Sequence, residues 1–344
     1  EKAFTPAMYV GGGVWMQETA DIVAKVLADH PESAVRAGLS ERVEGEQEVR
    51  VRPSLLPAEY TPMSNLLAGW YYCAYEPCDV GSEAHKAIEE EEREADGEYS
   101  QQAGRCASAA FTAALDTLVE KLGVLEEHLG RHAYCCGERM GVDDVMRFVV
   151  LQILFTTLGE LWGMTAPAYA RLPHVARWMG SMAAKDSNPF KYVHDGEMYY
   201  RAHRDWWATK MPQRLFPEVE QVVSRMRLKQ TGTEWDPAHP RAVVLCEPSG
   251  PTPESGPSVE PDDGSTVHLV GLGRPVIDPR DGALKAVGGA CTFGTTVEML
   301  LLEMRVPYVL HALDPDAKAA WYVNMFEKAF TPAMYVGGGV WMQE

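Results

Sequence analysis

The feature that most constrains this chain is an unbroken internal repeat. Residues 1–18, EKAFTPAMYVGGGVWMQE, recur without a single change as residues 327–344. The offset of 326 residues (327 minus 1) is longer than any solenoid repeat and is about the size of a two-domain protein. Two explanations remain open, a tandem array of near-identical units cut out of frame and an artefact of gene modelling, and we favour the array. The natural order of one unit would then begin near residue 265, run to 326 and continue into residue 1.

The charge of the chain limits its partners. The 344 residues include 31 Lys and Arg against 49 Asp and Glu, a net charge of −18. Binding to nucleic acid or to an anionic membrane surface through general electrostatics needs a basic face, so neither partner is expected. The longest nearly apolar run, from Val145 to Phe155, is well short of the ~20 residues that cross a bilayer, so no transmembrane span is expected.

The cysteines indicate a reducing compartment. The chain has seven cysteines, an odd number scattered along its length, which fits reduced thiols better than a disulfide framework. We therefore expect a cytoplasmic protein. No cysteine pair has the spacing of a zinc site, and His128 and His132 lie four residues apart without a third ligand. The prediction is no metal site, with both histidines at the surface.

In the order of the unit, the first part alternates strands and helices. Strands are predicted at Thr266–Gly271, Leu284–Val287 and Tyr308–Ala312, with a loop at Arg274–Gly282 and a helix over residues 295–304 that Thr295 or Thr296 can cap. Residues 5–10 and 13–17 predict a hairpin around a glycine turn. A helix then begins at Glu18–Thr19, since Ile22, Val23, Val26 and Leu27 share one face.

The second part is helical. A 3.6-residue apolar period over residues 111–129 predicts one helix, residues 143–162 a central buried helix, and residues 172–182 a short helix. We place the domains at 265–344 with 1–30 (α/β, with residues 1–18 duplicated at 327–344), 31–110 (an acidic insertion), 111–215 (all-α) and 216–264 (a linker between units rich in Pro, Gly, Ser, Asp and Glu).

Several motifs, in their order and spacing, resemble the glutathione transferase superfamily. They are Cys291-Thr292-Phe293-Gly294, Arg305-Val306-Pro307-Tyr308, Ala320-Trp321-Tyr322, Thr5-Pro6-Ala7, residues 15–22, His30-Pro31-Glu32 and residues 137–144. The likeness is nearest to dehydroascorbate reductases and chloride intracellular channel proteins. It implies a thioredoxin-like N-domain, split here by circular permutation, and a helical C-domain in which residues 137–144 resemble a buried capping element.

Cys291 is the candidate catalytic residue. A thiol directly before a helix meets unpaired N–H groups and the positive end of the helix dipole, which favour the thiolate and lower a pKa ordinarily near 8.5. The alternative is a small buried hydrophobic residue, which remains the favoured interpretation for the other six cysteines.

The resemblance implies a glutathione site around Cys291. Thr5 and Pro6 match the cis-proline turn that faces the cysteinyl part of glutathione, although an ordinary edge-strand proline is about as probable from local sequence. Glu18 and Thr19 match the pair that holds the γ-glutamyl end, with a plain capping box as the alternative. Phe293, in the Cys291-Thr292-Phe293-Gly294 motif, is also expected to line the site. Lys285 matches the family's basic residue only if residues 284–287 are the first strand; if residues 266–271 are that strand, no lysine matches.

The function implied is glutathione-dependent reduction of dehydroascorbate or of mixed disulfides, with glutathione as co-substrate and no metal. The partners expected are glutathione, a small electrophile or dehydroascorbate, and neighbouring units in the same polypeptide. Two other classes remain open, a non-enzymatic scaffold or channel-like relative and a conjugating transferase.

The repeat raises the question of which copy enters the sheet. Residues 1–18, the N-terminal copy, are joined to the helix at 19–29, which brings apolar surface with it. Residues 327–344, the C-terminal copy, are favoured only by their proximity along the chain, which lowers the entropy cost of closing the loop. We therefore predict that the N-terminal copy occupies the sheet and that the C-terminal copy is displaced.

Overall fold

The structure is a computed structural model of all 344 residues. It describes residues 8–9, 15–16, 19–43, 49–57, 109–155, 164–191, 201, 241–246, 267–277, 282, 284–287, 292–314, 333–335 and 341–343. The chain divides into two compact units, Glu1–Arg52 with Lys185–Ala202 and Thr233–Glu344, and Pro53–Ala184 with His203–Gly232. No helix among the described residues combines the length and the apolar character needed to span a membrane.

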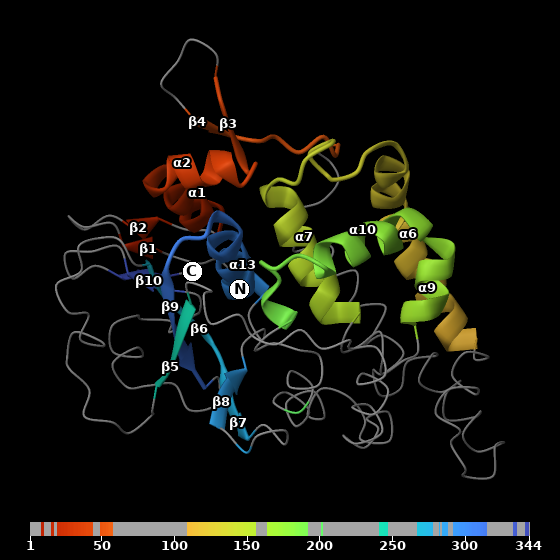
Figure 1. The fold of residues 1–344 in the computed structure, drawn as a ribbon. Helices are drawn as coiled ribbons and strands as arrows, with labels where there is room; N and C mark the ends of the chain where they lie inside the picture. The colour runs from red at the N-terminus through yellow and green to blue at the C-terminus, as the bar shows by residue number, and fades with distance from the viewer. Residues whose placement is uncertain are drawn as a thin grey trace. The chain divides into compact units, whose positions relative to one another are not determined.

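The first unit contains a five-stranded sheet in the order β11-β10-β6-β9-β5 (Figure 1). Its strands are β5 (Arg241–Cys246), β6 (Val267–Leu272), β9 (Tyr308–Leu313), β10 (Ala333–Tyr335) and β11 (Trp341–Gln343). Strands β5 and β6 flank β9 in parallel, while β10 is antiparallel to both β6 and β11. The predictions for β6 and β9 are confirmed to within about a residue at their ends.

Helix α13 (Thr292–Met304) connects the parallel strands β6 and β9 and lies against β6. The helix is apolar around most of its circumference, and Val297, Leu300 and Leu301 are completely buried, as expected of an interior helix. It ends in a Schellman motif with Arg305 in the left-handed region (φ 56°), where the N–H of Val306 donates to the carbonyl of Leu301 at 2.9 Å. Pro307 then leads into β9.

The start of α13 differs from the prediction. Thr295 and Thr296 were expected to cap the first turn, but the helix begins three residues earlier, at Thr292, and both threonines are buried inside it at 4% and 0% exposure. The reason is that Phe293 and Gly294 continue the helical backbone, so the first turn starts directly after Cys291.

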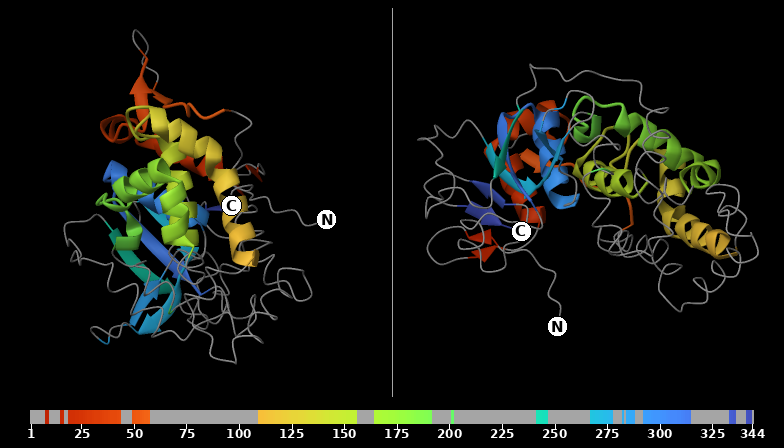
Figure 2. Two further views of the ribbon diagram at one scale, coloured as in Figure 1. Left: turned by 90° about the vertical axis from the view of Figure 1, so that its right-hand side faces the viewer. Right: turned by 90° about the horizontal axis from the view of Figure 1, so that it is seen from below.

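Helices far apart in the sequence meet in this first unit. Helix α1 (Thr19–Asp29) and helix α2 (Pro31–Arg36) both pack against α13, which is about 260 residues further along the sequence (Figures 1 and 2). The predicted face of α1 is confirmed, since Ile22, Val23, Val26 and Leu27 are 1–4% exposed. Helix α2 ends at Gly38 in a second Schellman motif, and a small hairpin follows, β3 (Ser40–Arg42) with β4 (Val49–Val51).

Both copies of the repeated segment form the predicted hairpin. In the N-terminal copy β1 (Met8–Tyr9) pairs with β2 (Trp15–Met16), and in the C-terminal copy β10 pairs with β11. The C-terminal copy, however, is the one in the five-stranded sheet, so the prediction that the N-terminal copy would occupy it is wrong. Helix α1 packs against α13 although its own hairpin is outside the sheet, so the apolar surface of α1 is buried either way and cannot favour the N-terminal copy.

Three segments carry more strand than predicted. Residues 274–277, predicted as loop, form β7 (Arg274–Ile277), which pairs with β8 (Leu284–Val287) in a separate two-stranded sheet. Residues 241–246 fall within the predicted linker but form β5, because RAVVLC is a β-branched apolar run that pairs along the whole of β9. Residues 31–52, predicted as part of the acidic insertion, contribute α2, β3 and β4 to the first unit.

The second unit is helical, as predicted. Its helices are α6 (Ala109–Arg131), α7 (Val142–Leu154), α9 (Thr165–Arg171) and α10 (Pro173–Ala183). Along α6 the apolar period is confirmed, with Leu115, Leu118, Leu122, Leu125 and Leu129 all 8% exposed or less. Helix α7 is buried on nearly every side, which confirms the central position predicted for it. Helix α10 packs against α6, α7 and α9. A 3-10 turn at Pro189–Lys191 follows in the part of the chain that belongs to the first unit.

Candidate functional site

The predicted catalytic residue lies next to the start of α13. Cys291 itself is outside the described residues, but the helix that follows it begins at Thr292 and runs for 13 residues. The backbone N–H groups of the first helical turn therefore belong to residues 292–295, directly beyond the thiol in sequence. Such a position stabilises a thiolate through the N–H groups and the helix dipole.

The other predicted site residues are only partly covered. Thr5, Pro6 and Glu18 lie outside the described residues. Thr19 is the first residue of α1 and Phe293 the second of α13, which gives their backbone positions only. The structure therefore brings the helices that carry Thr19 and Phe293 into contact within one unit.

The structure removes the condition under which Lys285 matches the family's basic residue, namely that residues 284–287 are the first strand. Lys285 lies on β8, which pairs with β7 and not with the five-stranded sheet. Both β5 and β6 run parallel to β9, but β6 is the one that lies against α13 and pairs with β10, so residues 267–272 are the first strand of the β-α-β arrangement. On that assignment no lysine of the strand matches the family's basic residue, because β6 reads VHLVGL.

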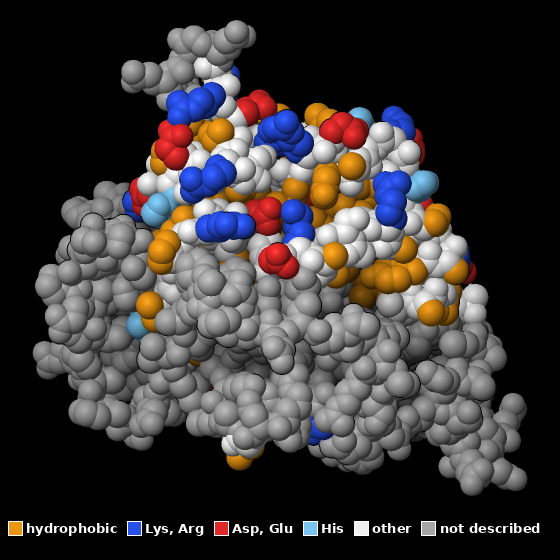
Figure 3. Space-filling model, viewed as in Figure 1, with side chains coloured by type: hydrophobic (Ala, Val, Ile, Leu, Met, Phe, Trp, Pro, Cys, Tyr) orange, Lys and Arg blue, Asp and Glu red, His pale blue; other side chains and the backbone are white. Residues whose placement is uncertain are grey.

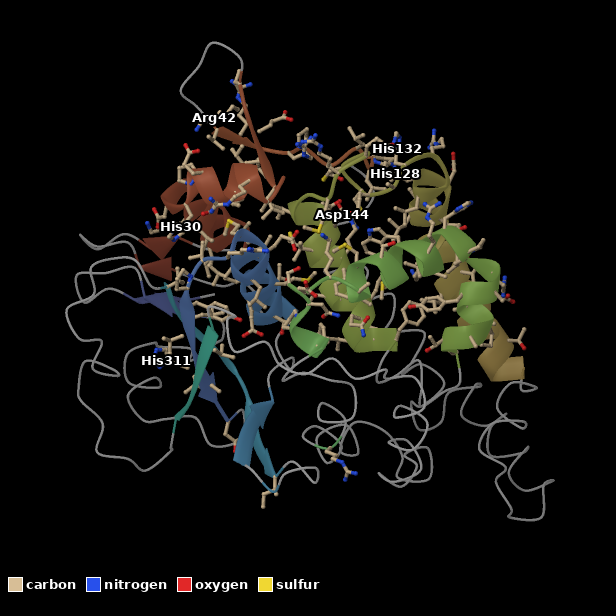
Figure 4. The ribbon with its side chains drawn as sticks, viewed as in Figure 1. His30, Arg42, His128, His132, Asp144 and His311 are labelled. Carbon is tan, nitrogen blue, oxygen red and sulfur yellow. The ribbon has the colours of Figure 1, made fainter. Side chains whose placement is uncertain are left out.

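A group of hydrogen-bonded side chains in the helical unit surrounds Asp144 (Figure 4). Asp144 is completely buried at the start of α7. Its Oδ1 accepts hydrogen bonds from the Cys135 N–H at 2.7 Å and from the Trp178 indole N–H at 3.0 Å, while Oδ2 accepts from the Gly141 N–H at 2.9 Å. One carboxylate thus caps α7, fixes the loop before it, and attaches α10 through Trp178.

The pKa shifts around Asp144 fit a carboxyl group that stabilises the fold. Burial raises the pKa of its carboxyl, and the N–H donors of Gly141, Cys135 and Trp178 oppose that rise. Burial together with the nearby Asp144 carboxylate also raises the pKa of the Cys136 thiol to about 12, and the same causes raise the pKa of Cys135. Both cysteines are buried and outside any disulfide, and their raised pKa keeps them neutral thiols at physiological pH, which are poor nucleophiles compared with a thiolate.

The sequence indicated residues 137–144 as a capping element but missed two of its partners, Trp178 and Cys135. Trp178 is completely buried in an otherwise apolar part of α10, and a buried indole N–H requires an acceptor, which is the signal that could have pointed to Asp144. Glu126 was also missed. Its two oxygens accept the N–H groups of His174 and Val175 at 3.0 and 2.8 Å, so a side chain of α6 caps the first turn of α10.

The histidine pair differs from the prediction. His128 was expected at the surface, but it is 4% exposed, and its Nε2 lies 3.1 Å from the carbonyl oxygen of Tyr134. The rings of His128 and His132 are 4.7 Å apart (Figure 4). The burial follows from the loop after α6, which turns back over the last turn of that helix. Within the described ranges, no group of three or more His, Cys, Asp or Glu side chains could hold a metal ion.

Charged side chains on the described surface alternate in sign. Figure 3 shows basic and acidic groups interspersed on this face. Arg42 pairs with Glu32, Arg52 lies 3.4 Å from Glu41, and Arg171 lies 2.6 Å from Asp116.

The comparison with protein families bears on this helical unit. The family described as glutathione S-transferase, C-terminal domain, matches residues 108–181. These residues form a glutathione S-transferase C-terminal domain. The match spans α6, α7 and α9 and most of α10, and it includes the capping carboxylate Asp144 and its partner Trp178. Comparison with curated proteins and with solved structures found no match.

Proposed function

We propose that the chain is a glutathione-dependent thiol oxidoreductase, of the dehydroascorbate reductase type, in which Cys291 is the nucleophile. The observation that carries the proposal is the start of α13 at Thr292, directly after Cys291, in a helix that connects two parallel strands. The glutathione S-transferase C-terminal domain at residues 108–181 makes glutathione a plausible co-substrate. The order β6, α13, β9 and then the antiparallel pair β10–β11 supports a thioredoxin-like half.

The proposed reaction takes place in three steps at the sulfur of Cys291. The Cys291 thiolate transfers two electrons to dehydroascorbate, which takes up two protons and leaves as ascorbate, while the sulfur gains a hydroxyl from water and becomes sulfenic acid. The first glutathione displaces that hydroxyl as water and forms a mixed disulfide. The second glutathione attacks the mixed disulfide, releasing glutathione disulfide and restoring the thiolate.

Burial at Cys135 and Cys136 supports the choice of Cys291. Both neutral thiols belong to the helical domain and are buried, with Cys135 0% and Cys136 6% exposed. Thr19, at the first position of α1, and Glu18 before it are proposed to bind the γ-glutamyl end of glutathione, since a helix start offers N–H donors to a carboxylate.

The test is glutathione-dependent reduction of dehydroascorbate by the full chain beside its Cys291→Ser variant. The matched control is Cys136→Ser, whose thiol is buried and neutral. We expect the first substitution to abolish turnover and the second to leave it nearly unchanged. Equal activity in the Cys291→Ser variant would contradict the proposal.

A further inference from the structure

The chain holds two identical hairpins but one place in the five-stranded sheet for either of them. We define the hairpin site as the edge of β6 at His268–Val270, where Ala333, Met334 and Tyr335 pair opposite Val270, Leu269 and His268. The described strands of the N-terminal copy, β1 and β2, form a separate two-stranded sheet. Within residues 1–344, one of the two hairpins therefore lies outside the five-stranded sheet.

The unused copy already has the conformation that the site accepts. In the N-terminal copy Met8 pairs with Met16 and Tyr9 with Trp15. In the C-terminal copy the equivalent residues pair in the same way, Met334 with Met342 and Tyr335 with Trp341. Eighteen identical residues with the same strand register present the same backbone groups and the same side chains, so the intrinsic interaction with β6 is the same for both.

The unused copy also lies close to the site, and pairing with β6 would stabilise it. Strand β1 lies next to β11, the outer strand of the sheet, and the N-terminal copy leads directly into α1, which packs on α13. An isolated two-stranded hairpin is marginally stable in water, whereas a hairpin that adds to a larger sheet gains a further ladder of hydrogen bonds. The free-energy difference between the two arrangements therefore comes only from the chain connections.

We propose that the hairpin site is exchangeable, and that residues 1–18 of this chain are its second occupant. In the structure described, Ala333–Tyr335 of the C-terminal copy fill the site. When they leave, the N-terminal copy pairs with β6 in the same register, with Ala7, Met8 and Tyr9 opposite Val270, Leu269 and His268. The chain then has two stable arrangements, which differ in whether the N-terminal or the C-terminal copy of the hairpin pairs with β6.

The repeat supplies a matched pair of variants for the test. Strand β10 has a neighbour on each side, so proline at Met334 removes a ladder hydrogen bond and excludes the C-terminal copy from the site. Proline at Met8 does the same to the N-terminal copy in an identical sequence context. The substitutions also give the two copies different masses, so hydrogen–deuterium exchange with mass spectrometry can separate peptides that are indistinguishable in the parent chain.

We expect peptides covering β6 to stay protected from exchange in Met8→Pro and in Met334→Pro and to lose protection only in the double variant. The N-terminal copy should be as protected in Met334→Pro as the C-terminal copy is in Met8→Pro. The thermal unfolding midpoint should fall by more in the double variant than the two single shifts add up to. Loss of β6 protection in Met334→Pro equal to that in the double variant would overturn the proposal, as would unchanged protection in all three.

Discussion

The Oδ1 atom of Asp144 lies 3.0 Å from the indole nitrogen of Trp178 and links the start of α7 to the middle of α10. Both side chains are completely buried. The same carboxylate also accepts the N–H groups of Gly141 and Cys135, so three donors from three places in the helical domain share one acceptor. A buried donor that loses its acceptor costs free energy, and this relationship therefore predicts which substitution disrupts the domain.

We predict that Asp144→Ala destabilises the helical domain by about 3–5 kcal/mol, because it leaves three buried N–H donors without an acceptor. Asp144→Asn should cost about 1–3 kcal/mol, since one oxygen remains for two donors while the amide group faces the third. The measurement is chemical denaturation followed by tryptophan fluorescence and circular dichroism. Glu138→Ala, at an exposed position of the same loop, is the control and should change the midpoint little. Equal stability of all three variants would show that Asp144 does not hold the domain together.

The second prediction concerns pH. Burial raises the folded-state pKa of Asp144 above its ordinary value of 3.8, so the folded protein binds this proton more tightly than the unfolded chain does. The stability contributed by this group is therefore highest below pH 3.8 and declines as the pH rises through the folded pKa. Comparing the free energy of unfolding of the parent and Asp144→Asn from pH 3 upward isolates the effect. The difference should vary with pH in that window, and a constant difference would contradict the raised pKa.

The third prediction concerns thiol reactivity. Cys136 has a pKa of about 12 and Cys135 is also raised, so neither forms much thiolate near neutral pH. Alkylation of the native chain at mildly acidic pH should label Cys291 before the other six cysteines, with Cys135 and Cys136 labelled only after unfolding. Peptide mapping by mass spectrometry gives the order. Uniform labelling, or early labelling of Cys135, would remove the support for Cys291 as the nucleophile.

The fourth prediction concerns glutathione itself. If Glu18 and Thr19 hold its γ-glutamyl end, Glu18→Ala with Thr19→Val should weaken retention on immobilised glutathione by about tenfold, which corresponds to the loss of a charge-assisted hydrogen bond of ~1.4 kcal/mol. Helicity by circular dichroism should stay unchanged. Glu344→Ala is the matched control, because it alters the same residue in the other copy of the repeat. If the control weakens retention and the double substitution does not, the C-terminal copy binds glutathione instead.

Local sequence determined most of the secondary structure. The 3.6-residue period of α6, the apolar face of α1, the strands β6, β8 and β9 and the glycine hairpins all follow from side-chain pattern and turn residues within a dozen positions. The capping role of residues 137–144 was also visible in the sequence. The donors from Trp178 and Cys135 were not, because they reach Asp144 from positions 34 and 9 residues away, and only folding brings them together.

The repeated segment separates most clearly what local sequence determines from what the tertiary structure decides. Eighteen identical residues have identical propensities, and both copies accordingly form the same hairpin in the same register. Yet β10 pairs with β6 inside the five-stranded sheet while β1 remains outside it. Nothing in the repeated residues can distinguish the two outcomes. The sequence by itself determined the hairpin, and the tertiary structure decided which copy enters the sheet, because one edge of β6 accepts one strand and the chain connections alone differ between the two candidates.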